Sequence, residues 1–210
     1  MGAKRFLPLV LLLSFLVSFM AQADVKVVDQ TFDSAPHQIV QDTTVKVLAA
    51  LDQGLDPVKA PQKFVEQLSI ILDPVVNFPG IARGVMGKYA KQASPQQVSE
   101  FAAAFKLGLV NTYGKGMSNF GNLEVAVLPP KEALGDQQRV TVVQEIRGGS
   151  NTNQVTYTMA KDNQDQGQWK MINVVINGIN LGLTFRGQFA AAVEKNGGDL
   201  AKTIREWDKG

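Results

Sequence analysis

The sequence predicts an α+β fold in which a curved, mostly antiparallel four-stranded sheet is backed by several helices and encloses an apolar cavity with them. Apolar residues recur at helical spacing from about residue 34 to 120, alternate with a period of two from about 123 to 177, and return to helical spacing from about 181 to 209. Helices followed by a run of strands are typical of α+β domains. We therefore expect a single domain over residues 24–210.

Residues 1–23 are predicted to form a cleaved signal peptide. Lys4 and Arg5 precede an apolar run from Phe6 to about Met20, and Ala21-Gln22-Ala23 then places small residues at the two positions that a signal peptidase recognises before its cleavage site. The run is shorter than the roughly 20 residues that a membrane span needs. The chain has no cysteine, so we expect neither a lipid anchor at the cleavage site nor a disulfide. The leader predicts export to the periplasm or beyond.

Four helices are predicted before residue 120, and a proline stands at the start of each. These prolines are Pro36, Pro61, Pro79 and Pro95. The predicted ends are Gly54 for the first helix, Asp73-Pro74 for the second and about Asn119 for the fourth. The fourth helix is apolar almost all round in its middle, which indicates burial on most of its sides.

Four strands follow, separated by loops that suit an antiparallel meander. Their alternating apolar residues are Leu123/Val125/Val127, Val140/Val142/Ile146, Val155/Tyr157/Met159 and Ile172/Val174/Ile176. Two helices close the chain. One runs from about Leu183 to Lys195 and ends at Gly197, and the other begins at Asp199.

Three glycines, Gly80, Gly84 and Gly87, are spaced so that they share one face of the third helix. Each costs about 1 kcal/mol relative to alanine inside a helix. Their presence predicts a close approach on that face, either by another helix or by a ligand lying in the groove. Beside a strongly apolar sheet, such a groove favours a cavity.

Charge excludes several classes of function. Lys4 and Arg5 belong to the leader, so the 21 basic residues become 19 in the mature chain, against 19 acidic ones. No run of basic residues is present, although nucleic-acid binders carry a basic patch. Binding to an anionic bilayer by bulk charge is equally unsupported.

The sequence also lacks the residues of common catalytic and metal sites. His37 is the only histidine and no cysteine exists, so zinc sites, cysteine nucleophiles and HExxH motifs are excluded or incomplete. No GxSxG elbow is present for a Ser-His-Asp triad. We expect a surface or capping role for His37, and no enzyme activity, metal or cofactor. Scattered carboxylates are expected to be solvated or to cap helices: Asp42, Asp52, Asp56, Glu66, Asp73 and Glu100.

Several motifs together carry a family resemblance. They are Pro74 with Phe78, Arg83-x-x-Met86-Gly87-x-Tyr89, Gln97 with Phe101 and Phe105, Tyr113, and the passage with Gly178, Leu181, Arg186, Gln188 and Phe189. In order and spacing, over essentially the whole mature chain, they resemble the MlaC or toluene-tolerance family of periplasmic phospholipid-binding proteins. Asn173 and Asn180 depart from the aspartate and serine common at these positions.

The resemblance implies a non-enzymatic carrier that holds a glycerophospholipid by its acyl chains and moves it between the inner and outer membranes, which maintains outer-membrane lipid asymmetry. It implies transient contact with two partners, an outer-membrane lipoprotein–porin complex and an inner-membrane ABC transporter complex. We expect a dry cavity of about 1,000 Å³ or more, the upper end of ordinary pockets. The predicted rim is Arg83 and Arg186. The predicted lipid-binding wall comprises Val75, Phe78, Ile81, Val85, Met86, Phe105, Leu109, Tyr113, Val142, Ile146, Tyr157, Met159, Ile172, Val174, Ile176, Ile179 and Leu181.

Two alternatives stay open at this point. A periplasmic interaction or chaperone module would show an exposed apolar patch and no closed cavity. An enzyme would need a cleft in which two carboxylates converge.

Overall fold

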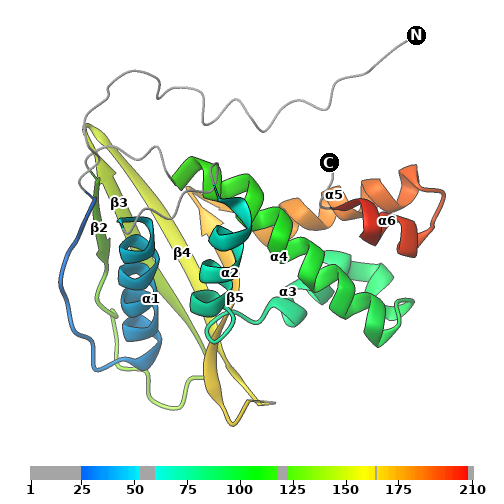
Figure 1. Ribbon diagram of the computed structural model, residues 1–210. Coiled ribbons are helices and arrows are strands. Elements are labelled where there is room, and N and C mark those ends of the chain that lie inside the picture. Colours follow the sequence, from blue (N-terminus) through cyan, green and yellow to red (C-terminus); the bar gives the residue numbers. More distant parts are fainter. Residues whose placement is uncertain (1–24, 53–59, 118–122, 164, 208–210) are drawn as a thin grey trace.

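The computed structural model describes residues 25–52, 60–117, 123–163 and 165–207, and confirms the predicted α+β fold (Figure 1). The elements, in chain order, are β1 (Val25–Val27), α1 (Ala35–Asp52), α2 (Pro61–Leu72), α3 (Phe78–Met86), the 3₁₀ helix η2 (Gly87–Lys91), α4 (Pro95–Met117), β2 (Leu123–Val127), β3 (Arg139–Gly148), β4 (Asn151–Asp162), β5 (Gln168–Ile176), β6 (Ile179–Asn180), α5 (Leu181–Lys195) and α6 (Leu200–Glu206). The predicted helix ends at Gly54 and Asn119 lie outside the described residues.

The sheet has six strands in the order β1-β2-β3-β4-β5-β6. The four predicted strands are β2 to β5, and they form the expected antiparallel meander. Two short strands extend it at the edges. Val25–Val27 pairs in parallel with β2, and Ile179–Asn180 pairs antiparallel with β5 after a turn in which Asn177 and Gly178 both have positive φ. Such a turn suits a tight hairpin.

A β-bulge interrupts the ladder between β4 and β5. Met171 lies opposite Met159 and Asn173 lies opposite Thr158, so Ile172 has no partner on β4. An extra residue of this kind changes which side chains face the helices.

The helix-facing side of the sheet is divided into two regions. In the first, α1 packs directly on the strands. Here Val40 of α1 meets Val127, Val140, Val142 and Met159 in a sheet core, and all five side chains are buried. The second region lies further along the strands and borders the cavity described below. Figure 1 shows α1 and α2 in front of the sheet.

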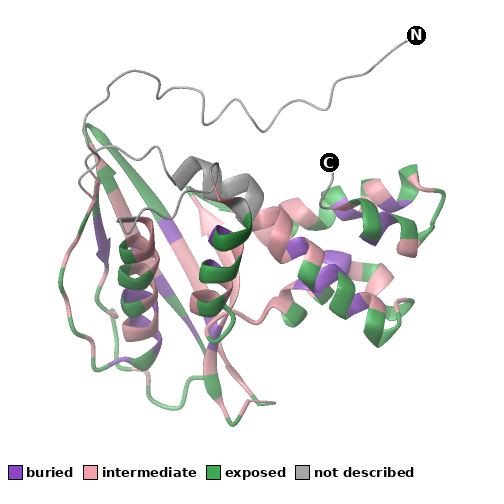
Figure 2. Ribbon diagram, in the orientation of Figure 1, coloured by how far each residue is buried: buried purple, intermediate pink, exposed green. Residues whose placement is uncertain are grey.

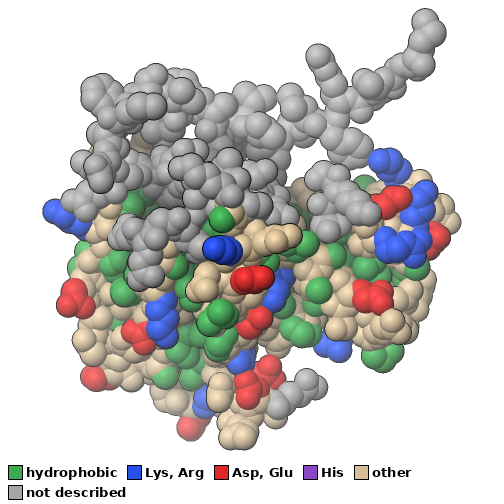
Figure 3. Space-filling view, viewed as in Figure 1, with side chains coloured by type: hydrophobic (Ala, Val, Ile, Leu, Met, Phe, Trp, Pro, Cys, Tyr) green, Lys and Arg blue, Asp and Glu red, His purple; other side chains and the backbone are tan. Residues whose placement is uncertain are grey.

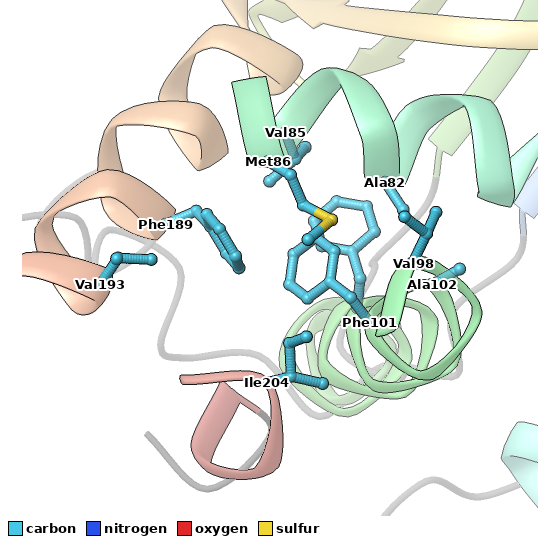
Figure 4. Packing of buried hydrophobic residues seen from close by; sticks show 10 residues of the cluster. Ala82, Val85, Met86, Val98, Phe101, Ala102, Phe189, Val193 and Ile204 are labelled. Atoms are coloured by element: carbon cyan, nitrogen blue, oxygen red, sulfur yellow. The ribbon is translucent and has the colours of Figure 1, made fainter. Parts of the chain in front are cut away.

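The remaining helices form a second, helical core between α3, α4, α5 and α6. Phe101 packs against Phe189 at a tilt of 59° with ring centroids 4.6 Å apart, and Trp207, near the C-terminal end, contacts both rings. In Figure 4, Met86 and Phe189 point toward Phe101 from α3 and α5. Figure 2 shows buried residues concentrated in this region and along the middle of the sheet. Aromatic burial of this kind dominates core stability.

The segment between α2 and α3 ties the helical part to the sheet. The N–H of Met171 donates to the carbonyl of Val75 (2.7 Å), and the N–H of Asn77 donates back to the carbonyl of Met171 (3.0 Å). The buried Lys170 ammonium donates to the carbonyl of Pro74 (2.5 Å) and pairs with Asp165 (2.7 Å). These bonds fix the point from which α3 leaves the sheet.

The three glycines of the third predicted helix do not share one explanation. At Gly80, a Cβ would stand 2.8 Å from Oδ1 of Asn77, which caps α3 by accepting from the N–H of Gly80. A Cβ at Gly84 would meet nothing within 4 Å. Gly87 has φ +55 and ends α3. No described residue approaches that face at Gly84, so the helix-packing alternative is wrong there, and a ligand in the groove stays a prediction.

Candidate functional site

An apolar cavity of about 400 Å³ lies between the sheet and the helices and is partly open to solvent. It separates the sheet core from the helical core. Its described wall consists of Val25, Val40, Thr43, Thr44, Val47, Leu48, Leu72, Val76, Phe78, Ile81, Phe105, Leu109, Leu123, Val125, Gln144, Ile146, Tyr157, Met171, Asn173, Val174, Leu181, Gly182 and Phe185.

The sheet side of the wall follows the alternation of the strands. Ile146 lies opposite Val125, and Tyr157 lies opposite Val174, so these side chains share the face that looks toward the helices. The helical core supplies the facing side. Phe105 and Phe185 meet edge to face with centroids 5.1 Å apart, and both line the cavity. Since rings of the core form part of the wall, its shape is set by core packing.

The polar groups next to α1 are joined in one hydrogen-bonded chain. The Tyr157 hydroxyl donates to Oε1 of Gln144 (2.8 Å), and Nε2 of Gln144 donates to Oγ1 of Thr44 (2.7 Å). Thr44 in turn donates to the carbonyl of Val40 (2.8 Å). Burial raises the pKa of Tyr157, so its phenol stays neutral. Buried polar groups satisfied in this way add little desolvation cost.

The described residues of the wall include no Lys, Arg, His, Asp or Glu. Within the described ranges, no three His, Asp or Glu side chains gather closely enough to hold a metal ion. Asp73, one of the scattered carboxylates, forms a surface ion pair with Lys106 (3.0 Å). On the face drawn in Figure 3, acidic and basic side chains of the described residues are interspersed. The described wall suits hydrocarbon binding, and none of its residues is a carboxylate.

Some of the predicted wall residues meet in this cavity. They are Phe78, Ile81, Phe105, Leu109, Ile146, Tyr157, Val174 and Leu181. They come from β3, β4, β5, α3, α4 and α5, so the structure brings together positions far apart in the chain. Contact of each with a lipid stays a prediction.

Four other predicted wall residues are buried in the two cores instead. Val85 and Met86 pack in the helical core, because only the first turn of α3, with Phe78 and Ile81, borders the cavity. Val142 and Met159 lie under α1 in the sheet core. Because α1 covers this half of the sheet, the cavity is smaller than the expected 1,000 Å³.

Local backbone geometry explains why four more residues are outside the described wall. Ile172 is the unpaired residue of the bulge, and Met171 lines the cavity instead. Val75 is replaced by its neighbour Val76, since Val75 belongs to the turn that ends α2 and Val76 forms the bridge to Met171 of β5. Ile176 and Ile179 pair with each other in the β5–β6 hairpin. The side chain of Tyr113, in α4, lies outside the described side chains.

The predicted rim arginines and His37 lie as follows. Arg83 is exposed on α3. Arg186 is exposed on α5, and its Nε donates to the carbonyl of Gly84 (2.7 Å). Neither belongs to the described wall, so a rim role stays a prediction. His37 is buried rather than on the surface, and its Nδ1 is 2.7 Å from the hydroxyl of Ser34.

Sequence reasoning missed the contribution of α1 to the wall. Val40, Thr43, Thr44, Val47 and Leu48 line the cavity along one side of this helix. Their spacing of three, four and seven residues could have indicated such a face. It also missed Gln144, although this residue occupies an inward position of the alternating β3 strand.

None of the described helices is long and apolar enough to cross a membrane. The profile of the family described as MlaC protein matches residues 41–209. The toluene tolerance protein ttg2D of Pseudomonas putida is 38% identical over 175 residues, which cover 82% of this chain and 79% of that protein.

A second relative is the intermembrane phospholipid transport system binding protein MlaC of Haemophilus influenzae, 22% identical over 151 residues, or 71% of this chain and 70% of that protein. Among solved structures, the phospholipid-binding protein of Ralstonia solanacearum in complex with a phospholipid aligns with a TM-score of 0.71 and 25% identity. The alignment covers 84% of this chain and 96% of that one.

Proposed function

This chain belongs to the MlaC family, and we propose that it is a periplasmic phospholipid carrier that holds acyl chains in the cavity and shuttles lipid between the outer and inner membranes. One relative is named as the binding protein of an intermembrane phospholipid transport system, and the aligned solved structure contains a phospholipid. The observation that carries the proposal is the cavity itself, whose described wall is uncharged and mostly apolar.

The cavity volume matches hydrocarbon of about one acyl chain. At roughly 30 Å³ per methylene, about the share of a water molecule in the liquid, 400 Å³ holds roughly 13 methylenes. The opening to solvent leaves room for the head group and for the remainder of the lipid at the mouth. A diacyl lipid therefore extends beyond the enclosed part.

Burial of this hydrocarbon is sufficient to keep a lipid bound. At about 0.8 kcal/mol per methylene, roughly 13 methylenes contribute about 10 kcal/mol against release into water. Because no charged side chain lines the described wall, the phosphate stays at the mouth in water. Arg83 and Arg186 are the proposed rim residues, since both are exposed on helices whose neighbouring residues Ile81 and Phe185 line the cavity.

The cellular part of the proposal follows from the leader and the family. Residues 1–23 direct export to the periplasm, and an outer-membrane lipoprotein–porin complex and an inner-membrane ABC transporter complex exchange lipid with the carrier. No catalysis is assigned to the chain. A chaperone module is not favoured, because the apolar surface here lines a cavity.

Extraction of the purified protein tests this function. The protein is isolated from the periplasm without detergent, extracted with organic solvent and analysed by mass spectrometry, with a periplasmic protein of similar size purified in parallel as the control. We expect stoichiometric glycerophospholipid in the carrier and background amounts in the control. Lipid-free protein that also fails to take up phospholipid from vesicles would contradict the proposal.

A further inference from the structure

Asn173 is a polar wall residue whose side chain has no hydrogen-bond partner among the described residues. The other polar wall side chains are satisfied within the protein. Thr43 donates to the carbonyl of Ile39 (2.6 Å), and Thr44, Gln144 and Tyr157 form the chain described above. A carboxamide carries two N–H donors and one oxygen acceptor. In an apolar cavity, unmade hydrogen bonds of this group favour a polar group on the ligand.

The neighbouring helix leaves space for this carboxamide. A Cβ at Gly182 would stand 2.8 Å from Oδ1 of Asn173 and 3.3 Å from Oδ1 of Asn180, so glycine is what lets Asn173 occupy its position. Asn180 is already engaged, because its oxygen accepts from the N–H of Leu183 (3.1 Å) and caps α5. Asn173 therefore lies against the first turn of α5 without a bond to it.

The position is at the edge of the cavity. Leu181 and Gly182 belong to the wall, and exposed residues lie near them on either side in the chain. Leu183 is 59% exposed, and Ile179 is 41% exposed. In a lipid whose chain fills the cavity, the ester linkage is the first polar group beyond the hydrocarbon. An ester carbonyl accepts hydrogen bonds and carries no charge, so a neutral N–H donor is its matching partner.

We infer that the Asn173 carboxamide donates a hydrogen bond to the ester carbonyl of a bound acyl chain and so distinguishes ester-linked from ether-linked lipids. The inference rests on the proposed carrier function. An ionised aspartate at this position would have no donor and would repel the carbonyl oxygen.

A competition between two matched lipids tests the inference. The probes are diester and diether phosphatidylglycerol with identical chain lengths, which share the head group and phosphate and differ in the carbonyls. Delipidated protein is mixed with vesicles containing both in equal amounts, and bound lipid is counted by mass spectrometry. We expect wild-type protein to favour the diester about five- to tenfold, which is the difference in affinity that one additional hydrogen bond typically produces. Equal uptake of the two lipids by wild-type protein overturns the inference.

Variants separate the carbonyl from other contacts. Asn173→Leu should bring the preference close to one while lipid uptake continues. Asn173→Asp should shift the preference toward the diether and weaken uptake of both lipids, because the carboxylate repels the carbonyl and is costly to desolvate. If Asn173→Leu weakens uptake of the diester and the diether equally, Asn173 contacts the phosphate or head group, and the ester assignment is wrong. Uptake of neither lipid by wild-type protein contradicts the carrier function itself, which is a different outcome.

Two glycine variants supply a matched pair. Gly182→Ala should reduce the preference without removing Asn173, because the new Cβ displaces the carboxamide. Gly187→Ala, on the same helix, meets nothing within 4 Å and should leave the preference unchanged. Full preference in Gly182→Ala would contradict the proposed geometry.

Discussion

Val174 lines the cavity, whereas its neighbour Val175 lies outside the described wall on the same strand. Aspartate at either position meets the same unfavourable strand propensity. At Val174, however, a bound chain would have to desolvate the carboxylate or protonate it. Protonating a group of ordinary pKa 3.9 at pH 7.5 requires about 5 kcal/mol, at about 1.4 kcal/mol per pH unit. This is roughly half of the about 10 kcal/mol that the buried methylenes contribute.

We therefore expect Val174→Asp to bind phospholipid up to several thousandfold more weakly than wild-type protein at pH 7.5, at about 1.4 kcal/mol per tenfold. Binding should recover roughly tenfold for each unit by which the pH is lowered toward 5, because protonation becomes cheaper. Vesicle-to-protein transfer of a fluorescent phospholipid measures this, with Val175→Asp as the control and urea unfolding as the check on stability. Similar lipid binding by the two variants would refute the assignment of Val174 to the binding wall.

Three further predictions concern stability, and equilibrium urea unfolding measures each. Burial lowers the pKa of His37, so the free energy of unfolding should fall as the pH drops below about 6.5, by at most about 1.4 kcal/mol per pH unit. His37→Gln should lack this pH-dependent loss, and a variant with the same pH dependence as wild-type protein would contradict the prediction. Gly84→Ala should stabilise the protein by about 0.4–1 kcal/mol because its Cβ meets open space, whereas Gly80→Ala should destabilise it by disturbing the helix cap. Lys170→Met should lower the free energy of unfolding by about 1.5–3 kcal/mol, because it removes the hydrogen bond from the ammonium to the Pro74 carbonyl. A loss below about 0.5 kcal/mol would argue that this bond contributes little to stability.

The sequence patterns predicted the elements well where they were long and strongly periodic. The alternation in β2 to β5 and the prolines at helix starts placed these elements within a few residues of their observed bounds. The strands β1 and β6 were not predicted. With three and two residues, they are too short to show a period, and pairing with a longer neighbour stabilises them.

The candidate wall was harder to predict because side-chain direction depends on backbone details. The bulge at Ile172 puts Met171 at the wall, and no residue type in β5 signals it. Met86 and Met159 are as apolar as any wall residue, but α-helices cover them on the side where a cavity was expected. Apolar periodicity identifies a buried face, and only the arrangement of the helices decides which part of that face stays open.

Photo-crosslinking with a phospholipid that bears a diazirine at the end of an acyl chain tests most directly whether the chain lies in the cavity. After irradiation of the lipid-loaded protein, peptide mass spectrometry locates the adducts. We predict adducts at wall residues such as Val47, Leu109 and Ile146, which come from a helix on each side and from the sheet. Adducts confined to exposed surface residues, such as Ile70 on α2, would contradict the account.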